Sequence, residues 1–133
     1  MATGRRLSLE ILPGRFAIWR LAPEEEVPDL SGFFSLTCVG SDRSVVLAEE
    51  EVPTGAQAAG GYRCLRLQGE FPLEETGVLA QLSAPLAESG IPLIVISTFT
   101  TDYLLLREVD MPMARNALSS RGIQILPPLR ANH

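Results

Sequence analysis

The residues with the clearest chemical potential lie in two short stretches, ETGVLA at 75–80 and ISTFTTD at 96–102. Gly77 stands just before a run with helical spacing, and the free N–H groups and positive dipole end of a helix start attract a carboxylate. A glycine lets that anion approach the backbone closely. Glu75 and Asp102 carry negative charge that an ammonium or guanidinium group would neutralise. A carboxylate site beside a cation site describes a free amino acid.

A plainer interpretation of the same residues stays open. Thr100, Thr101 and Asp102 can serve only to build a hairpin turn, because their side-chain oxygens bond readily to nearby backbone groups. Glu75 can be only an acidic residue favoured near a helix start, and Phe99 only a core residue.

Apparatus for catalysis is hard to assemble from this sequence. The single histidine is the last residue, His133, and the chain has no lysine and no GxSxG motif. The glycines at 55, 60 and 61 lack the flanking pattern of a phosphate loop. Glu75 and Asp102 acting as an acid–base pair is the remaining enzymatic hypothesis, but no other residue positions a reaction. The sequence therefore predicts a protein that is not an enzyme and needs no cofactor.

Metal binding and disulfide formation are also disfavoured by residue spacing. Cys38 and Cys64 lie in apolar, strand-like surroundings with no CxxC motif and no nearby histidine. We expect both to be reduced core thiols. The acidic run EEEVP occurs at 24–28 and at 49–53, and short runs of this kind are usually solvated loop edges, so no metal site is expected there.

Length, composition and charge narrow the class of protein. The chain has 133 residues, of which 46% are hydrophobic and 20% charged, enough for one domain or two very small ones. Its net charge of -5 disfavours nucleic acid and anionic membrane as partners. No apolar run approaches about 18 residues, and the N-terminus lacks a secretory pattern. We expect a soluble, cytoplasmic protein.

The second half of the chain has a regular order of elements. Alternation and helical spacing predict strand 62–68, helix 76–89 with Thr76 as N-cap, strands 91–100 and 102–109 turning near Thr101–Asp102, helix 111–121 and strand 123–126. This βαββαβ order is the ferredoxin-like arrangement, a four-stranded antiparallel sheet with both helices on one face. The loop into the first helix and the end of the following strand then lie near one edge, which brings Glu75 and Asp102 together.

The first half is a weaker version of the same pattern. Strands are expected at 7–11 and 15–21, followed by a hairpin formed by 33–40 and 43–51. The intervening helix position, 22–32, is too short and too rich in proline for more than a turn or two, and 53–61 reads as a linker. The predicted fold class is α+β, with a degenerate ferredoxin-like unit of shortened helices over 1–61 and a complete one over 62–133.

Two motifs give this pattern a family resemblance. GVLAxLSxPLAxxGI begins at Gly77 and ISTFxTDYxLL begins at Ile96, both within residues 76–110. This segment resembles the ACT domain of a family of small bacterial tandem-ACT proteins related to the CASTOR arginine sensors of animals. FFSLT, SVVLAEEEVP and GYRCLRLQG are similar to the divergent first unit of that family. The resemblance implies two ferredoxin-like ACT units and a regulatory, non-catalytic protein that binds an amino acid between two domains.

The resemblance also implies which residues contact the ligand. They are Glu75, Thr76, Gly77 and Leu79 at the helix entry, Thr98, Phe99 and Asp102 at the strand end, and Pro92 and Leu93 from a neighbouring domain. Because this chain has only two units, Pro92 and Leu93 would come from a second copy, which implies a homodimer with an isologous interface. The presence of both Glu75 and Asp102 favours a cationic amino acid such as arginine. The alternative is a dimerisation or protein-interaction module that binds no ligand.

Overall fold

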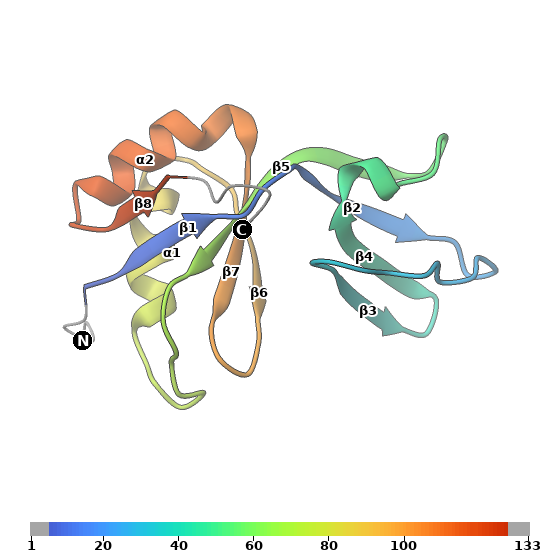
Figure 1. Ribbon diagram of the computed structural model, residues 1–133, viewed down its shortest axis with the longest axis horizontal. Helices are drawn as coiled ribbons and strands as arrows, with labels where there is room; N and C mark the ends of the chain where they lie inside the picture. The colour runs from blue at the N-terminus through green and yellow to red at the C-terminus, as the bar shows by residue number, and fades with distance from the viewer. Residues whose placement is uncertain (1–5, 128–133) are drawn as a thin grey trace. The chain divides into compact units, whose positions relative to one another are not determined.

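The computed structural model describes residues 6–127 and divides the chain into two compact units. The first, here called the helical unit, comprises Met1–Pro13 with Arg63–His133, and the second, the strand unit, is Gly14–Tyr62 (Figure 1). Each unit has its own hydrophobic core.

The helical unit contains the βαββαβ order predicted from the sequence. Its elements are β1 (Ser8–Ile11), the second part of β5 (Ala58–Leu67), α1 (Val78–Glu88), β6 (Ile94–Ser97), β7 (Asp102–Arg107), a 3-10 turn η2 (Glu108–Asp110), α2 (Met111–Ser119) and β8 (Gln124–Leu126). From β5 onward the order and type of these elements confirm the prediction. Gly90 and Gly122, with φ of 71° and 77°, end the two helices where helix-stop signals were expected.

The sheet of the helical unit contains one strand more than a ferredoxin-like sheet. Its order is β8-β1-β5-β7-β6. β1 pairs antiparallel with β5, where Leu9 lies opposite Leu67, and parallel with β8, where Leu9 lies opposite Ile125. From the sequence, residues 1–61 were assigned to an N-terminal unit, but β1 joins the sheet of the helical unit, whose other elements were assigned to residues 62–133. Alternation of Leu7, Leu9 and Ile11 predicts a strand, but it does not specify which strand becomes its partner.

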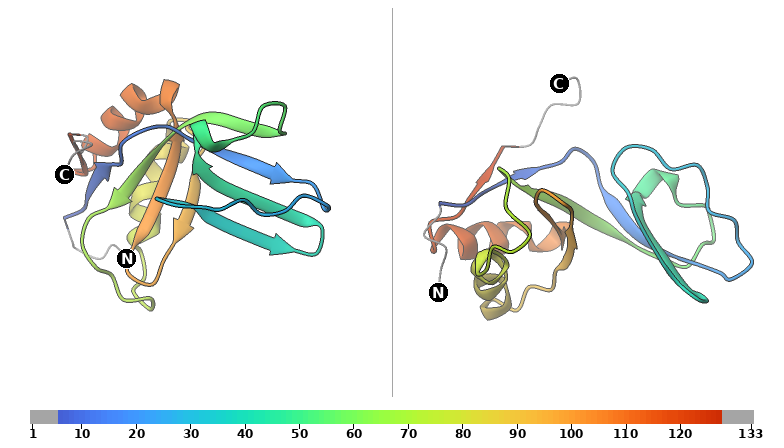
Figure 2. Two further views of the ribbon diagram at one scale, coloured as in Figure 1. Left: turned by 45° about the vertical axis from the view of Figure 1, so that its right-hand side comes forward. Right: turned by 90° about the horizontal axis from the view of Figure 1, so that it is seen from below.

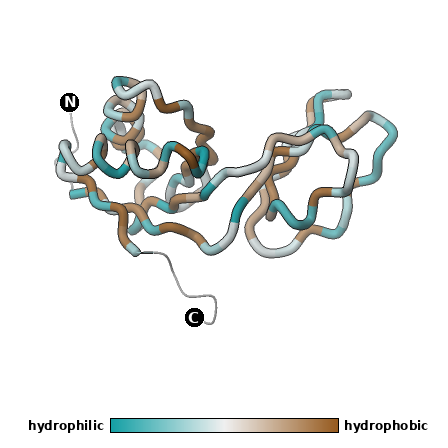
Figure 3. The backbone as a smooth tube through the Cα atoms, turned by 90° about the horizontal axis from the view of Figure 1, so that it is seen from above, coloured by the Kyte–Doolittle hydropathy of each residue, from teal (hydrophilic) through white to brown (hydrophobic). Residues whose placement is uncertain are grey.

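One apolar cluster holds the helical unit together. Both helices cover one face of the sheet and contact each other (Figure 2). The buried members of the cluster are Leu7, Leu9, Ile11, Leu65, Leu67, Val78, Leu82, Leu86, Ile91, Leu104, Leu106, Met111, Ala114, Leu118 and Ile123. Hydrophobic and hydrophilic residues alternate along the helices in Figure 3, as expected for helices with one buried face.

The strand unit has the ferredoxin-like strand order without the helices. β2 (Phe16–Leu21), β3 (Ser35–Val39), β4 (Asp42–Ala48) and the first part of β5 are arranged as β3-β4-β2-β5, with antiparallel neighbours. Within Gly14–Tyr62 the only helical element is the 3-10 turn η1 (Glu49–Glu51). At the first helix position, 22–32, where the proline content predicted at most a turn or two of helix, no helix forms.

Loops cover the core of the strand unit where helices are missing. Trp19, Leu21, Val45 and Leu47 form this core, and the loop residues Leu30, Val52 and Ala56 pack against it. The two cysteines differ in their environments. Cys64 is buried as expected, but Cys38 is exposed on β3, so its assignment to a core was wrong. β3 has only one neighbouring strand in this unit, which leaves most of its side chains accessible.

Candidate functional site

A cavity of about 280 Å³ opens at the start of α1 in the helical unit. It is lined by Phe71, Pro72, Leu73, Glu75, Gly77, Val78, Leu79, Ala80, Ser97, Thr98, Thr101 and Asp102. We call it the helix-start cavity. Five of the nine predicted site residues line it, namely Glu75, Gly77, Leu79, Thr98 and Asp102. The loop into the first helix and the following strand end thus meet at one edge, as the topology required.

The helix start presents backbone donors to this cavity. Gly77 is the N-cap, with φ of 85°, and α1 begins at Val78. The first intrahelical hydrogen bond runs from Gln81 N to Gly77 O at 3.1 Å. The N–H groups of Val78, Leu79 and Ala80 therefore have no partner within the helix. Predicting Thr76 as the N-cap was wrong by one residue, because a glycine in the left-handed region supplies the turn that a capping side chain would otherwise stabilise.

The opposite wall is the hairpin between β6 and β7. Ser97 and Asp102 face each other at the ends of the two strands, and Ser97 Oγ donates a 2.5 Å hydrogen bond to Asp102 Oδ1. The hairpin loop is Thr98–Thr101, slightly before the predicted turn. Thr98 N donates to Thr101 O at 2.8 Å, and Thr98 Oγ1 donates to the same oxygen at 3.1 Å. The hydroxyl of Thr98 thus helps to shape the loop, as the plainer interpretation proposed for its neighbours.

Two further hydrogen bonds fix the floor and side of the cavity. Thr101 is only 4% exposed, and its Oγ1 donates to Leu67 O on β5 at 2.7 Å. Phe71 N donates to Thr100 O at 2.8 Å and joins the segment 71–73 to the hairpin loop. These bonds link three separate parts of the chain, so the cavity walls are held by structure that does not depend on a ligand.

The other four predicted site residues do not line the helix-start cavity. Phe99 was expected in a core or in the ligand site, but it is 81% exposed and lines a second cavity of about 520 Å³. We call this the Phe99 cavity, which is lined by Glu70, Phe71, Pro72, Leu73, Glu74, Phe99 and Thr100. Thr76 is exposed and does not line the helix-start cavity. Pro92 is also exposed, and Leu93 packs against the core of the helical unit.

Some lining residues were missed by sequence reasoning. Phe71, Pro72 and Leu73 separate the helix-start cavity from the Phe99 cavity, since they contribute to both. Their sequence was interpreted only as a turn that ends a strand. Leu73 is 66% exposed, whereas Phe71 also packs against the core of the helical unit, so an apolar loop residue beside a proline is a signal for a cavity wall only at Leu73.

The charges of the helix-start cavity are of one sign. Glu75 and Asp102 are its charged lining residues, and no arginine lines it. Asp102 on the hairpin wall and the helix N–H groups at the start of α1 give the cavity two electrostatically different sides, and the loop that enters the helix adds Glu75. Such a cavity suits a small molecule that carries both a cation and a carboxylate.

The described part of the chain offers neither a metal site nor a membrane-spanning helix. Residues 6–127 contain no cluster of three or more histidine, cysteine, aspartate or glutamate side chains arranged to hold a metal ion. No helix in this range combines the length and the apolar character that a bilayer span requires. His133 lies outside the described residues.

Sequence comparison identifies the class of protein. Residues 57–120 match the family model of the ACT domain, a range that runs from the start of β5 to the end of α2. ACT domains are regulatory modules, so the class defined by this fold and sequence is a regulatory ACT-domain protein.

Individual relatives narrow the class further. The chain is 31% identical over 101 residues to the human protein CASTOR3P, a match that covers 66% of this chain and 62% of the relative. The chain thus spans less than two thirds of that relative's length. It contains an ACT domain and is related to CASTOR.

Solved structures support the same fold. Protein Atu0741 from Agobacterium tumefaciens is 32% identical, with a TM-score of 0.87 and coverage of 98% of this chain and 99% of that one. The ligand-free regulatory subunit of aspartate kinase from Thermus thermophilus has a TM-score of 0.56 at 10% identity, covering 86% of this chain and 95% of that subunit. The second similarity concerns the fold alone.

Proposed function

We propose that this chain is a regulatory protein that binds a free amino acid in the helix-start cavity and catalyses no reaction. The observation that carries this proposal is the meeting of a helix start with two carboxylates, Glu75 and Asp102, in one small cavity. The cytoplasmic location expected from the sequence fits a sensor of free amino acids.

The geometry supports one orientation of the ligand. Its carboxylate faces the N–H groups at the start of α1, where Gly77 has no side chain to obstruct the approach. Its cationic group faces Asp102, whose Oδ1 is engaged by Ser97 while no described residue bonds Oδ2. A cavity of about 280 Å³ is near the lower end of the range for small-molecule sites. We therefore propose a cationic amino acid such as arginine as the ligand.

A second copy of the chain completes the proposed site. Pro92 and Leu93 do not line the helix-start cavity of their own chain, so they can contribute only from a partner. Beside the cavity, Phe99 and Leu73 are 81% and 66% exposed. Large apolar side chains exposed together favour a covering partner. The proposed assembly is a homodimer with two equivalent sites.

Thermal unfolding across a panel of free amino acids tests the proposal. A ligand present at about 100 times its dissociation constant stabilises the native state by about 2.7 kcal/mol, which shifts the Tm by several degrees. The expected result is a shift with a basic amino acid and none with its decarboxylated amine. If no amino acid at about millimolar concentration shifts the Tm, amino-acid sensing is excluded while the fold assignment stands.

The exposed apolar residues also favour a second candidate function, a module that mediates contact with a protein and binds no ligand. Phe99 and Leu73 would then dock a partner directly. Sedimentation with and without the amino-acid panel distinguishes the two. A dimer that Phe99→Ser weakens, in a protein whose Tm responds to no amino acid, would favour the interaction module.

A further inference from the structure

The sheet of the strand unit ends in an edge strand. Among the residues that the structure describes, β3 pairs with β4 alone, and it lies at the outer edge of this unit in Figure 1. An edge strand presents a row of backbone N–H and C=O groups that no neighbouring strand bonds. The outer side of β3 is therefore a template on which a further strand can pair.

β3 lacks the features that usually protect such an edge. Edge strands are commonly very short, broken by a proline or a bulge, or marked by charged side chains. The sequence of β3 is SLTCV, and its register against β4 is continuous from the pair Ser35–Val46 to the pair Val39–Asp42. With five residues β3 is also longer than the other edge strands of the described chain, β8 with three and β6 with four.

Apolar side chains lie along this edge. Leu36 is opposite Val45 of the strand-unit core, yet it is 39% exposed because no strand lies on its other side. Phe34 and Val39 are 43% and 70% exposed. A strand added to β3 would bring its own side chains beside these residues and remove part of this apolar surface from water.

The charge of the chain is concentrated around this edge strand. Residues 14–62 carry eight acidic and three arginine side chains, whereas the rest of the chain carries eight of each. The net charge of -5 therefore lies in the segment that forms the strand unit. A second copy would bring the same negative charge to the edge, and like charges repel, so the field favours a cationic partner over a second copy.

An arginine holds an acidic loop beside the hairpin that contains β3. Nη1 of Arg43 donates to the carbonyl oxygens of Ala22, Pro23 and Glu25 at 2.9, 3.2 and 2.8 Å. Arg43 lies opposite Cys38 in the pairing of β3 with β4. The loop that follows β2 is thus fixed close to the end of the edge strand.

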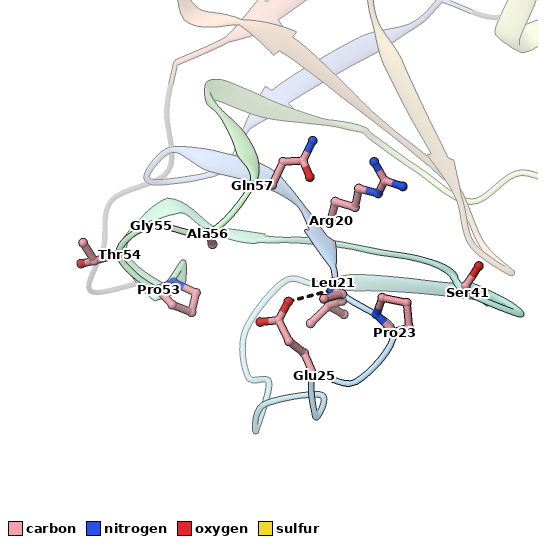
Figure 4. A pocket seen from close by; sticks show the side chains of 11 residues that line it. Arg20, Leu21, Pro23, Glu25, Ser41, Pro53, Thr54, Gly55, Ala56 and Gln57 are labelled. Atoms are coloured by element: carbon pink, nitrogen blue, oxygen red, sulfur yellow. Dashed lines mark hydrogen bonds between the residues drawn. The ribbon is translucent and has the colours of Figure 1, made fainter.

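A cavity beside Arg20 gives the same placement. Its volume is about 550 Å³, and it is lined both by Glu25 of the loop and by Ser41 of the turn between β3 and β4 (Figure 4). The three carboxylates of Glu24–Glu26 belong to this loop, and all three residues are exposed. They are therefore positioned to attract a basic side chain that approaches the end of β3.

We propose that β3 is a docking edge for an extended, basic segment of another protein, which pairs with it as a fifth strand of the strand unit. Backbone hydrogen bonds hold the added strand, and its apolar side chains lie beside Leu36. Its lysine or arginine side chains face the acidic loop at 24–26. This interaction goes beyond amino-acid binding and does not depend on the helix-start cavity.

The test uses a fluorescently labelled short peptide of alternating lysine and valine as the probe. Its anisotropy is followed as the full chain is added at low salt. The contact is smaller than a standard interface, so the expected Kd is weak, about 0.1 mM. Raising the salt concentration from about 0.05 to about 0.5 M should weaken binding by about tenfold, because the attraction is between exposed charges.

Two control peptides separate charge from strand pairing. A glutamate–valine peptide keeps the backbone and reverses the charge, whereas a lysine–proline peptide keeps the charge and loses the N–H group at every proline. Both should bind at least about tenfold more weakly than the lysine–valine peptide. Equal binding of either control, or no binding of the lysine–valine peptide, overturns the proposal.

Variants locate the contact. Cys38→Lys adds a positive charge to the edge and should weaken binding by about tenfold or more, whereas Cys38→Ser should not. Gln124→Lys on β8, also exposed at a sheet edge, is the matched control. Glu24→Gln combined with Glu26→Gln should weaken binding several-fold, and Glu74→Gln in the helical unit should have no effect. An unchanged Tm shows that each variant is folded. Equal effects of Cys38→Lys and Gln124→Lys would contradict docking at β3.

Hydrogen exchange and sedimentation complete the test. The lysine–valine peptide should slow amide exchange in Ser35–Val39 and leave Gln124–Leu126 unaffected, since only the first segment gains hydrogen bonds. Unchanged exchange in β3 would mean that the peptide binds elsewhere. If Cys38→Lys instead dissociates a dimer of the chain, a second copy fills the edge and the proposal fails.

Discussion

Ser97 Oγ donates a hydrogen bond of 2.5 Å to Asp102 Oδ1 across the last residue pair between β6 and β7. This contact orients the carboxylate at the edge of the helix-start cavity. It also separates two roles, since Ser97 positions the side chain and Asp102 carries the charge.

Asp102→Ala should abolish the thermal stabilisation by a basic amino acid while the ligand-free protein remains folded. The reason is that the ligand's cation loses its charged partner, an effect of about 1.5–3 kcal/mol. Tm measurements with and without ligand give the result. Ser97→Ala is the matched control, because it removes the hydrogen bond and keeps the carboxylate, so its response should fall less. An undiminished response in Asp102→Ala would remove Asp102 from the site.

Thr101→Val should destabilise the helical unit by about 1–3 kcal/mol. The change preserves side-chain shape but leaves the buried Leu67 carbonyl without the Thr101 hydroxyl that donates to it at 2.7 Å. Urea unfolding measures this free energy. The control is Thr100→Val, since Thr100 is exposed and its hydroxyl is 3.5 Å from that of Thr98. Equal effects from both variants would mean that the Leu67 bond is unimportant.

Gly77→Ala should lower the Tm through backbone strain. Gly77 has a φ of 85°, and a residue with a Cβ in the left-handed region costs about 1–2 kcal/mol. Gly77→Asn should cost less, because asparagine visits this region more readily. Thermal unfolding of both variants checks the order. If alanine is tolerated as well as glycine, the helix start does not need the conformation described.

Cys64 should make stability depend on pH in the alkaline range. Burial raises the pKa of its thiol from 9.0 to about 12. The unfolded chain therefore loses this proton above about pH 9 while the native chain keeps it, so the free energy of unfolding falls as pH rises from 9.0 toward about 12. The slope from this group approaches about 1.4 kcal/mol per pH unit.

Urea unfolding between about pH 8 and pH 10.5 measures this decline, and Cys64→Ala should remove it. Thiol labelling gives an independent reading, because Cys38 is exposed and Cys64 is buried. Only Cys38 should react in the native protein, whereas both should react in denaturant. Rapid native labelling of Cys64 would contradict the burial on which the pH dependence rests.

Local sequence patterns were sufficient to predict most helices and strands of the helical unit. Helical spacing and the Ser89–Gly90 stop defined α1, and continuous apolar runs with a short polar loop defined the pair β6 and β7. These signals are local, since a helix or a hairpin forms between residues close in sequence. The order of these elements, and not proximity in sequence, allowed the meeting of Glu75 and Asp102 to be predicted.

Partners distant in sequence could not be predicted in this way. The pairing of β1 with β5 and β8 joins residues more than fifty positions apart, and alternation alone does not select among strands. Likewise, Arg43 holds the loop at 22–25 through backbone carbonyls, which have no sequence signature. Which side chains are buried depends on these long-range pairings, so burial could not be predicted from local patterns.

The sequence by itself determined the ACT-like order of elements and the residue types at the helix-start cavity, because periodicity and turn chemistry act over short distances. Only the tertiary structure decided that Phe99 is exposed outside this cavity, that Thr101 is buried against Leu67, and that a further cavity forms beside Arg20. Each of these depends on which segments pack together, and the free energy of that packing is shared among residues far apart in the chain.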